Sequence, residues 1–101
     1  MQNILDDLVK TIKKNKHLDI KISYTSFLLS GGLSKCIEKM EEEFSELKEA
    51  LNDKSNIVHE AADTIYHILV TLEAADIKFE DVLKELEDRK KQSGIEEKNN
   101  R

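Results

Sequence analysis

The chain has 101 residues, of which 39% are hydrophobic and 37% charged, and its formal net charge is -5. This length allows a single domain over residues 1–101, and the acidic balance argues against nucleic-acid binding through backbone charge. The longest uninterrupted hydrophobic runs have three residues, as in Phe27–Leu29, which excludes a membrane-spanning segment, and the absence of proline favours long helices.

The first predicted helix runs from about Ile4 to Lys16, with Asn3 as its N-cap. Its hydrophobic residues recur at helical spacing and form one face. They are Ile4, Leu5, Leu8, Val9 and Ile12. Residues 17–21 form a connection, and a short helix follows from Ser23 to Leu29. Gly31–Gly32 ends that helix and is the strongest break in the chain.

The third predicted helix, from about Leu33 to Leu51, has the clearest periodicity. Its hydrophobic residues fall within one arc of about 100° on a helical wheel. They are Leu33, Cys36, Ile37, Met40, Phe44, Leu47 and Leu51. The polar residues 52–55 predict a turn, after which Ser55 or Asn56 caps the next helix.

The fourth predicted helix, from about Ile57 to Ala75, is hydrophobic around well over half of its circumference, which is typical of a buried helix. A link over residues 76–78 leads to a fifth helix from about Phe79 to Lys91, followed by a loosely held tail. The inward residues of the fifth helix are Val82, Leu83 and Leu86. These elements predict an all-α fold, a bundle of four to five helices.

Acidic residues cluster on one face of the third predicted helix. Glu43 and Glu46 are three residues apart, and Glu42 and Glu46 are four apart, so each pair shares a helix face. Like charges at these spacings repel by roughly a few tenths of a kcal/mol unless something neutralises them. One interpretation is a solvated acidic face that nearby lysines partly neutralise. These lysines are Lys35, Lys39 and Lys48.

The fourth predicted helix carries a narrow polar strip that favours a second interpretation. The strip consists of Glu60, Asp63, Thr64, His67 and Thr71. Acidic residues on a mostly hydrophobic helix are unfavourable unless they are paired or bind a cation. Thirteen residues separate Glu46 from Glu60, enough for a tight turn between antiparallel helices, so the two acidic clusters can face each other. Such a cluster suits a hard divalent cation, Mg²⁺ before Ca²⁺, whereas no His/Cys set has zinc spacing.

Two carboxylate motifs, Glu42-Glu43-x-x-Glu46 and Glu60-x-x-Asp63, together resemble the signature of the all-α, MazG-type nucleotide pyrophosphohydrolases. Further segments are similar to phosphoribosyl-ATP pyrophosphohydrolase, a histidine-biosynthesis family within that superfamily. These segments are Ser23–Ser26 with Leu28–Leu29, Glu60–Asp63 leading into Tyr66–Val70, Glu80–Leu86, and the tail Ser93–Arg101. The N-terminal helix and link, residues 1–22, carry no part of the resemblance.

The resemblance implies an interlocked homodimer and Mg²⁺-dependent cleavage between the α and β phosphates of phosphoribosyl-ATP, giving phosphoribosyl-AMP and pyrophosphate. It implies metal ligands at Glu43, Glu46, Glu60 and Asp63, with Glu42 as a further ligand, a ligand of a second metal, or the catalytic base. The alternative is a related MazG-type enzyme acting on another nucleoside triphosphate. A non-catalytic helical dimerisation module is a third hypothesis.

Three positions depart from the family pattern. Phe27 and Glu38 stand where the family usually has lysine, and Glu41 stands where it usually has glycine. Two basic groups that could meet phosphates are therefore missing. Lys35 and Lys39 remain on the helix that leads to the site, and we predict that they contact the substrate.

Several other residues allow two interpretations each. His67 is either a hydrogen-bonded core histidine, which we favour, or a partner of Asp63. Cys36 lies on the hydrophobic stripe and is a small core residue rather than a nucleophile. Tyr24 and Thr25 are either helix-start residues or substrate contacts.

The cysteine content and the first residues of the chain predict the cellular compartment. A single cysteine forms no internal disulfide, and the first residues mix Asp and Lys in a way that secretory signals do not. We therefore expect a reducing cytoplasm, with no membrane and no nucleic acid as partner. The wide hydrophobic coverage of the fourth helix in so small a chain separately predicts a homodimer.

Overall fold

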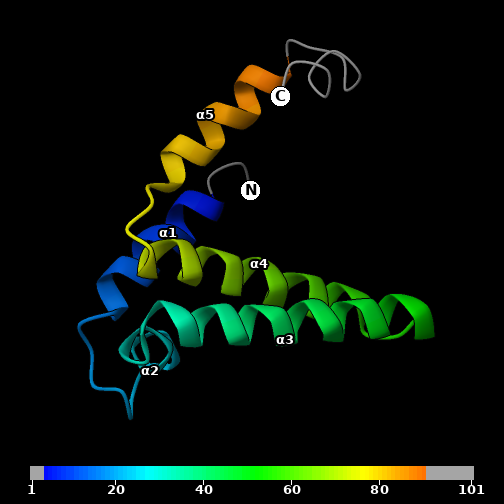
Figure 1. The fold of residues 1–101 in the computed structure, drawn as a ribbon, viewed down its shortest axis with the longest axis horizontal. Helices are drawn as coiled ribbons and strands as arrows, with labels where there is room; N and C mark the ends of the chain where they lie inside the picture. Colours follow the sequence, from blue (N-terminus) through cyan, green and yellow to red (C-terminus); the bar gives the residue numbers. More distant parts are fainter. Residues whose placement is uncertain (1–3, 91–101) are drawn as a thin grey trace.

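A computed structural model of the chain describes residues 4–90, and Figure 1 shows how its five helices are arranged. Their bounds are α1 (Ile4–Asn15), α2 (Tyr24–Ser30), α3 (Gly32–Asp53), α4 (Ile57–Ala74) and α5 (Phe79–Arg89). No strand occurs among the described residues, so the all-α prediction is confirmed. None of the helices in this part of the chain is long and hydrophobic enough to cross a membrane. The predicted Asn3 cap and the tail from Gln92 onward lie outside the described residues.

Asp19 holds the link between α1 and α2 through hydrogen bonds to its carbonyl and its side chain. The N–H groups of Ile22 and Ser23 donate to the Asp19 carbonyl at 2.9 and 3.0 Å, and the Asp19 carboxylate accepts from the Lys21 N–H at 2.8 Å. Ser23 then caps α2, because its hydroxyl oxygen accepts from the Ser26 N–H at 3.1 Å. The predicted start of the short helix is therefore confirmed.

Two glycines lie at the break between α2 and α3, as predicted: Gly31 lies between the helices and Gly32 is the first residue of α3. The Gly31 N–H ends α2 by donating to the Leu28 carbonyl at 3.2 Å. A Cβ atom at Gly31 would lie only 2.9 Å from the Cβ of Lys35, so this lysine packs directly over the glycine. Gly32 begins α3 with a φ of +84°, which other residues adopt only with strain. The two glycines therefore allow α3 to begin at once, in a new direction.

α3 and α4 form an antiparallel hairpin, the longest part of the molecule (Figure 1). α3 continues to Asp53, so the prediction of a turn over residues 52–55 is wrong by two residues at its start. The turn contains Lys54 and Asn56 with φ of 57° and 58°, left-handed conformations that asparagine tolerates. Asn56 occupies the N-cap position as predicted, but its side chain makes no capping hydrogen bond.

The face of α4 that packs against α3 is partly polar, as expected if the two acidic clusters face each other. Thr64, His67 and Thr71 are buried, whereas Val58 is 84% exposed. The Thr71 hydroxyl donates to the His67 carbonyl at 2.7 Å and lies 3.3 Å from the Cys36 carbonyl oxygen on α3. Hydroxyl groups satisfied in this way are buried without an unpaired donor. The polar strip therefore faces the neighbouring helix, and part of the hydrophobic surface faces outward.

A small hydrophobic core lies at the end of the hairpin near α1 and α2. Its buried members are Ile12, Leu28, Cys36, Leu69 and Val70. Partly buried residues of α1, α2, α4 and the start of α5 pack around it. Cys36 is 2% exposed, and its thiol lies 3.4 Å from the Leu28 carbonyl oxygen. The interpretation of Cys36 as a core residue is therefore confirmed.

α5 projects away from the hairpin (Figure 1). None of its residues is buried, and the prediction that Leu83 and Leu86 point inward is wrong for a single copy of the chain, since both are exposed. Val82 is half-buried. Much of the predicted hydrophobic stripe of α3 is exposed as well. Its exposed members are Leu33, Ile37, Phe44 and Leu51. One copy of the chain therefore leaves extensive hydrophobic surface uncovered.

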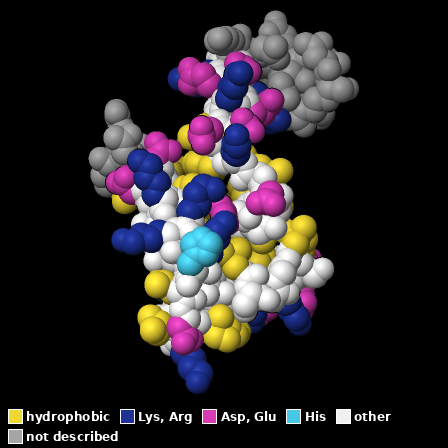
Figure 2. All heavy atoms as spheres, turned by 90° about the vertical axis from the view of Figure 1, so that its left-hand side faces the viewer, with side chains coloured by type: hydrophobic (Ala, Val, Ile, Leu, Met, Phe, Trp, Pro, Cys, Tyr) yellow, Lys and Arg dark blue, Asp and Glu magenta, His cyan; other side chains and the backbone are white. Residues whose placement is uncertain are grey.

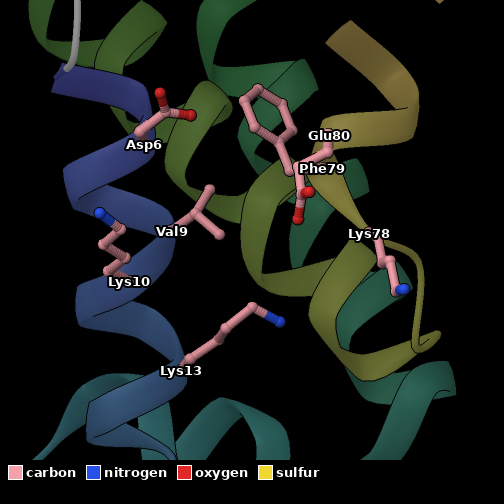
Figure 3. Close-up of a pocket in the computed structure, with 7 residues that line it drawn as sticks. All are labelled: Asp6, Val9, Lys10, Lys13, Lys78, Phe79 and Glu80. Atoms are coloured by element: carbon pink, nitrogen blue, oxygen red, sulfur yellow. The ribbon is translucent and has the colours of Figure 1, made fainter. Parts of the chain in front are cut away.

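A hollow of about 290 Å³ lies between α1 and the start of α5 (Figure 3). Val9 and Phe79 form its hydrophobic part, and Lys10, Lys78 and Glu80 contribute charges of both signs. Phe79 also packs against the core. α5 is therefore joined to the body of the molecule at its first residue, beside an unfilled space.

Glu73 fixes α1 against α4. Its carboxylate pairs with Lys13 at 2.7 Å and with Lys16 at 2.9 Å, and its side chain is only 8% exposed. Burial by itself raises the pKa of Glu73, but the hydrogen bonds and positive charges of the two lysines together outweigh burial and hold this pKa below its usual 4.5. Figure 2, which views this end of the molecule, shows basic side chains gathered beside hydrophobic ones.

Candidate metal centre

Four carboxylates from two helices meet near the hairpin turn. Glu43 and Glu46 lie on α3, and Glu60 and Asp63 lie in the first two turns of α4. The Glu46 carboxyl interacts both with Glu43, on its own helix, and with Glu60, on the opposite helix. We call these four residues the carboxylate cluster. The structure thus brings together the four residues that the sequence predicted as metal ligands.

The electrostatics of the carboxylate cluster favour binding of a proton or a cation. Burial raises the pKa of Glu43, and hydrogen bonding to Glu46 and repulsion from its charge raise it further. The pKa of Glu60 is raised by burial first, and then by the charge of Glu46 and a hydrogen bond to it. Among residues 4–90, no lysine or arginine forms an ion pair with a member of the cluster. Such uncompensated carboxylates are stabilised when a cation binds between them.

Thr64 connects the two halves of the carboxylate cluster through their backbones. Its hydroxyl donates to the Glu60 carbonyl at 2.8 Å and lies 3.2 Å from the Glu43 carbonyl oxygen. The residue is buried, so these contacts are shielded from water. One buried side chain therefore helps to set the distance between α3 and α4 at the cluster.

Glu42 lies beside the carboxylate cluster rather than within it. Its side chain is exposed, and its Oε2 lies 3.5 Å from Nζ of Lys39. This ion pair joins neighbouring turns of α3. The predicted roles of Glu42, as a further ligand or as the base, stay predictions.

His67 packs behind the carboxylate cluster within an aromatic group. It is buried, and its Nδ1 lies 2.9 Å from the Asp63 carbonyl oxygen, so Nδ1 carries a proton and donates. Its Nε2 faces the Tyr24 hydroxyl at 3.4 Å, and the rings of Tyr24 and Tyr66 meet it edge-on. Both nitrogens are thus engaged within the chain. The interpretation of His67 as a hydrogen-bonded core histidine is confirmed, and it holds the Asp63 backbone in place.

The two predicted substrate contacts at the start of α2 differ in accessibility. Thr25 is buried, and its hydroxyl bonds to the Tyr66 hydroxyl. Tyr24 is exposed, and its ring stacks on Phe27 with the ring centroids 6.2 Å apart. Of the two, Tyr24 is therefore the one that presents its side chain to solvent.

A second hollow, of about 300 Å³, opens between α2 and the first turns of α3. Phe27 and Leu28 form its hydrophobic wall, and Lys35 and Lys39 give it positive charge. Ser30 and Gly31 complete its lining. Because Lys39 also pairs with Glu42, the hollow borders the acidic face of α3.

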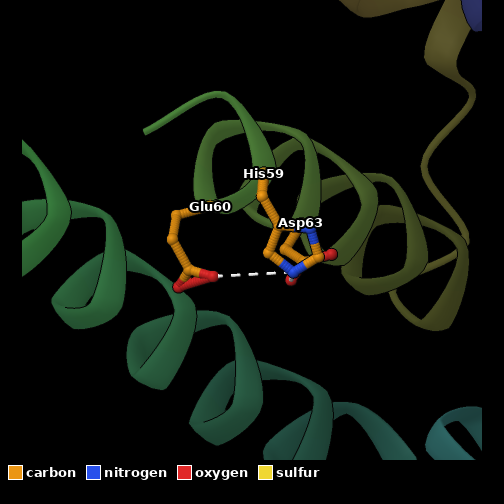
Figure 4. A group of neighbouring side chains, drawn as sticks. All are labelled: His59, Glu60 and Asp63. Carbon is orange, nitrogen blue, oxygen red and sulfur yellow. Dashed lines mark ion pairs between the residues drawn. The ribbon is translucent and has the colours of Figure 1, made fainter. Parts of the chain in front are cut away.

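His59 is a candidate ligand that the sequence reasoning missed. Its Nε2 lies 3.2 Å from Oδ2 of Asp63 and 3.8 Å from Oε1 of Glu60 (Figure 4). One ligand atom from each of these three residues lies within 4.8 Å of the others. The spacing in the sequence could have identified His59, because it precedes Asp63 by four residues and therefore shares its helix face.

The donor set of the carboxylate cluster fits a hard divalent cation. It offers only carboxylate oxygens, held by two packed helices, and oxygen is the ligand that Mg²⁺ prefers. Glu46 on α3 interacts electrostatically with Glu43 on its own helix and with Glu60 across the hairpin.

Comparisons with known proteins agree on one family. Residues 5–90 match the family profile described as phosphoribosyl-ATP pyrophosphohydrolase. A phosphoribosyl-ATP pyrophosphatase of Ruegeria pomeroyi is 45% identical over 98 residues, which cover 95% of this chain and 93% of that protein. Another from Roseobacter denitrificans is 46% identical over 99 residues, with 96% and 94% covered. A histidine biosynthesis bifunctional protein of Helicobacter hepaticus is 46% identical over 98% of this chain and 44% of that protein. No solved structure matches the chain.

Proposed function

The chain belongs to the phosphoribosyl-ATP pyrophosphohydrolase family, and from this membership we propose that it hydrolyses phosphoribosyl-ATP to phosphoribosyl-AMP and pyrophosphate, the second step of histidine biosynthesis. The structural observation that carries the proposal is the carboxylate cluster, four acidic residues from two helices without a lysine or arginine partner among residues 4–90. A non-catalytic dimerisation module would have no need for such a cluster.

Glu43, Glu46, Glu60 and Asp63 would hold Mg²⁺ between α3 and α4. When bound, Mg²⁺ neutralises charge on phosphate oxygens and lowers the pKa of water. The chain contributes the geometry, because Thr64 and His67 fix the backbones of the residues that carry the carboxylates. Ligands held in place before the substrate binds need little rearrangement during the reaction.

Glu42 is our candidate for the base. The water oxygen bonds to the α phosphorus, the bond from that phosphorus to the bridging oxygen breaks, and pyrophosphate leaves with the electron pair. The proton of the attacking water passes to the Glu42 carboxylate, which is exposed and next to Glu43. Its present partner, Lys39, would turn toward substrate phosphates and free the carboxylate for this role.

The hollow between α2 and α3 is the proposed binding place for the nucleotide. Phe27 offers an exposed ring that is already stacked with Tyr24, and a purine base can extend such a stack. Lys35 and Lys39 meet the negative charge of the phosphates between this stack and the carboxylate cluster. The lysine usually found at position 27 is thus replaced by a group that recognises the base rather than the phosphate.

We also propose that the chain acts as a homodimer. The exposed hydrophobic residues of α3, α4 and α5 exceed what scattered surface positions explain, and a second copy would cover them. Light scattering at micromolar concentration should give twice the 11.6 kDa chain mass. A stable species of the single-chain mass would refute the dimer. Cytoplasmic location stays a prediction from the sequence.

An assay of the purified protein tests the proposed function. We expect Mg²⁺-dependent release of pyrophosphate from phosphoribosyl-ATP, faster than from any member of a panel of ordinary nucleoside triphosphates. Preference for another triphosphate would favour the related MazG-type activity instead. Release from none of these substrates, by protein that circular dichroism shows to be helical, would favour the dimerisation module.

A further inference from the structure

We propose that His59 supplies an imidazole nitrogen to the metal centre, so that the site prefers nitrogen-seeking divalent ions such as Co²⁺ more strongly than its carboxylates alone would. The inference rests on the proposed metal centre and adds a ligand of a different chemical kind. Carboxylates alone favour Mg²⁺, Ca²⁺ and Mn²⁺, whereas an imidazole raises affinity for later first-row metals. The consequence is a change in metal preference.

The His59 imidazole lies next to two of the proposed metal ligands. Nε2 of His59 lies 3.2 Å from Oδ2 of Asp63 and 3.8 Å from Oε1 of Glu60, and Figure 4 shows the three side chains converging from one end of α4. One ligand atom from each residue lies within 4.8 Å of the others, a spread that one cation can bridge. A small shift would exchange the contact between His59 and Asp63 for bonds from both to the cation.

The surroundings leave the His59 ring free to make that shift. Its side chain is 63% exposed, and its ion-pair contacts are those with Glu60 and Asp63. Glu60 and Asp63 are less exposed, at 15% and 41%, so a cation bound to them is partly covered on the protein side. The imidazole would close the site from the solvent side.

The other two histidines do not offer a nitrogen to this site. His67 is buried, with Nδ1 on the Asp63 carbonyl and Nε2 facing the Tyr24 hydroxyl. His17 lies in the link between α1 and α2, at the end of the molecule opposite the hairpin turn (Figure 1). A nitrogen signal from a bound metal is therefore assignable to His59.

Pulsed electron paramagnetic resonance on the full chain loaded with Mn²⁺ gives a direct test. Wild-type protein should show coupling of the manganese electrons to an imidazole ¹⁴N, and His59→Gln should lose it. His17→Gln is the matched control and should keep it. Wild-type protein without this coupling, or His59→Gln that retains it, would overturn the inference.

Affinity for metals without substrate gives a second readout. By calorimetry, His59→Gln should weaken Co²⁺ binding by about tenfold or more and change Mg²⁺ binding by less than about twofold. Equal weakening of both ions would mean that His59 only helps to position the carboxylates and is not a ligand, and would overturn the inference. Asp63→Asn tests the proposed metal centre separately from the role of His59, because it should weaken the binding of both ions. Wild-type protein that binds neither ion would refute the proposed metal centre itself.

Discussion

The two ends of α4 carry carboxylates in opposite electrostatic states. Near its last turn, Glu73 is buried between Lys13 and Lys16, and these lysines hold its pKa below the usual value. In its first turn, Glu60 faces Glu46 across the hairpin, and burial and that repulsion raise its pKa. The same residue type on one helix is thus paired with two lysines at one end and opposed by another carboxylate at the other.

The difference separates a structural carboxylate from a functional one. Glu73 needs nothing beyond the chain, and its ion pairs join α1 to α4 next to the core. Glu60 and its neighbours are arranged at a cost in repulsion that only a proton or a cation relieves. Substitutions at the two ends should therefore change different measured quantities. A substitution in the carboxylate cluster should change activity and the response to metal, whereas a substitution of Glu73 should change stability.

The largest expected effect is on catalysis at the carboxylate cluster. Asp63→Asn keeps the side-chain volume but removes one negative charge, so it should weaken metal binding and transition-state stabilisation. We expect pyrophosphate release to fall about 10²- to 10³-fold at saturating Mg²⁺, which is the typical cost of one preorganised contact. Circular dichroism should show an unchanged helical fold.

Glu41→Gln is the matched control for this measurement. Glu41 lies on α3, the helix of Glu43 and Glu46, is exposed, and is outside the carboxylate cluster. It should lose far less activity than Asp63→Asn. Equal losses in the two variants, or an Asp63→Asn rate within a few-fold of wild type, would show that the ligands are assigned wrongly.

The next effect is stabilisation by metal. A ligand that binds only the folded state stabilises it by about 2.7 kcal/mol at a hundredfold excess over its Kd. Melting curves should therefore shift upward with Mg²⁺, and more than with NaCl of equal ionic strength. Asp63→Asn should reduce this shift, while Glu73→Gln should not. Equal shifts from the two salts would indicate general screening alone.

A smaller effect is expected on stability from Glu73. Glu73→Gln removes two ion pairs to a side chain that is 8% exposed, while both lysines can return to solvent. Since charge-assisted hydrogen bonds contribute about 1.5–3 kcal/mol and the lysines are partly exposed, we expect unfolding free energy to fall by about 1–2 kcal/mol. Thermal melting of the metal-free protein measures this. Unchanged stability would show that the ion pairs do not hold α1.

The smallest effect, and the most direct comparison of the two ends, is the pH dependence of stability without metal. The folded pKa of Glu73 lies below its reference 4.5, so its contribution is present above pH 4.5 and is lost as pH falls through the lowered pKa. The folded pKa values of Glu43 and Glu60 lie above 4.5, so their contribution is present below that pH and is lost as pH rises through the raised values.

Metal-free protein should therefore become more stable as pH falls toward 4.5 through the raised pKa values, and less stable as pH falls further through the lowered pKa of Glu73. Denaturant unfolding at a series of pH values checks this. Saturating Mg²⁺ should remove the rise, because the cation replaces the protons. Glu73→Gln should reduce the decline at low pH and keep the rise. A stability that falls steadily from pH 7 downward would contradict the assignment of raised pKa values.

The sequence alone predicted most of the local structure and the identity of the cluster. Helix periodicity, Ser23 and the Gly31–Gly32 break located the helices, because these signals act within a few residues. Spacings of three residues paired Glu43 with Glu46 and Glu60 with Asp63, since the helical repeat alone puts such pairs on one face. The short connection between the two helices then required an antiparallel hairpin.

Only the tertiary structure decided which residues are buried where the helices meet. The helical repeat predicted that the polar strip of α4 faces α3, but the burial of Thr64 and Thr71 depends on carbonyl oxygens of α3 that accept their hydroxyl groups. The outward exposure of Leu86 likewise depends on where α5 leaves the body of the molecule. The structure also decided that His59 contacts Asp63 while Glu42 turns to Lys39, because these contacts depend on the orientation of each side chain. The helical repeat is a property of one segment, whereas burial arises from packing between segments that are distant in sequence.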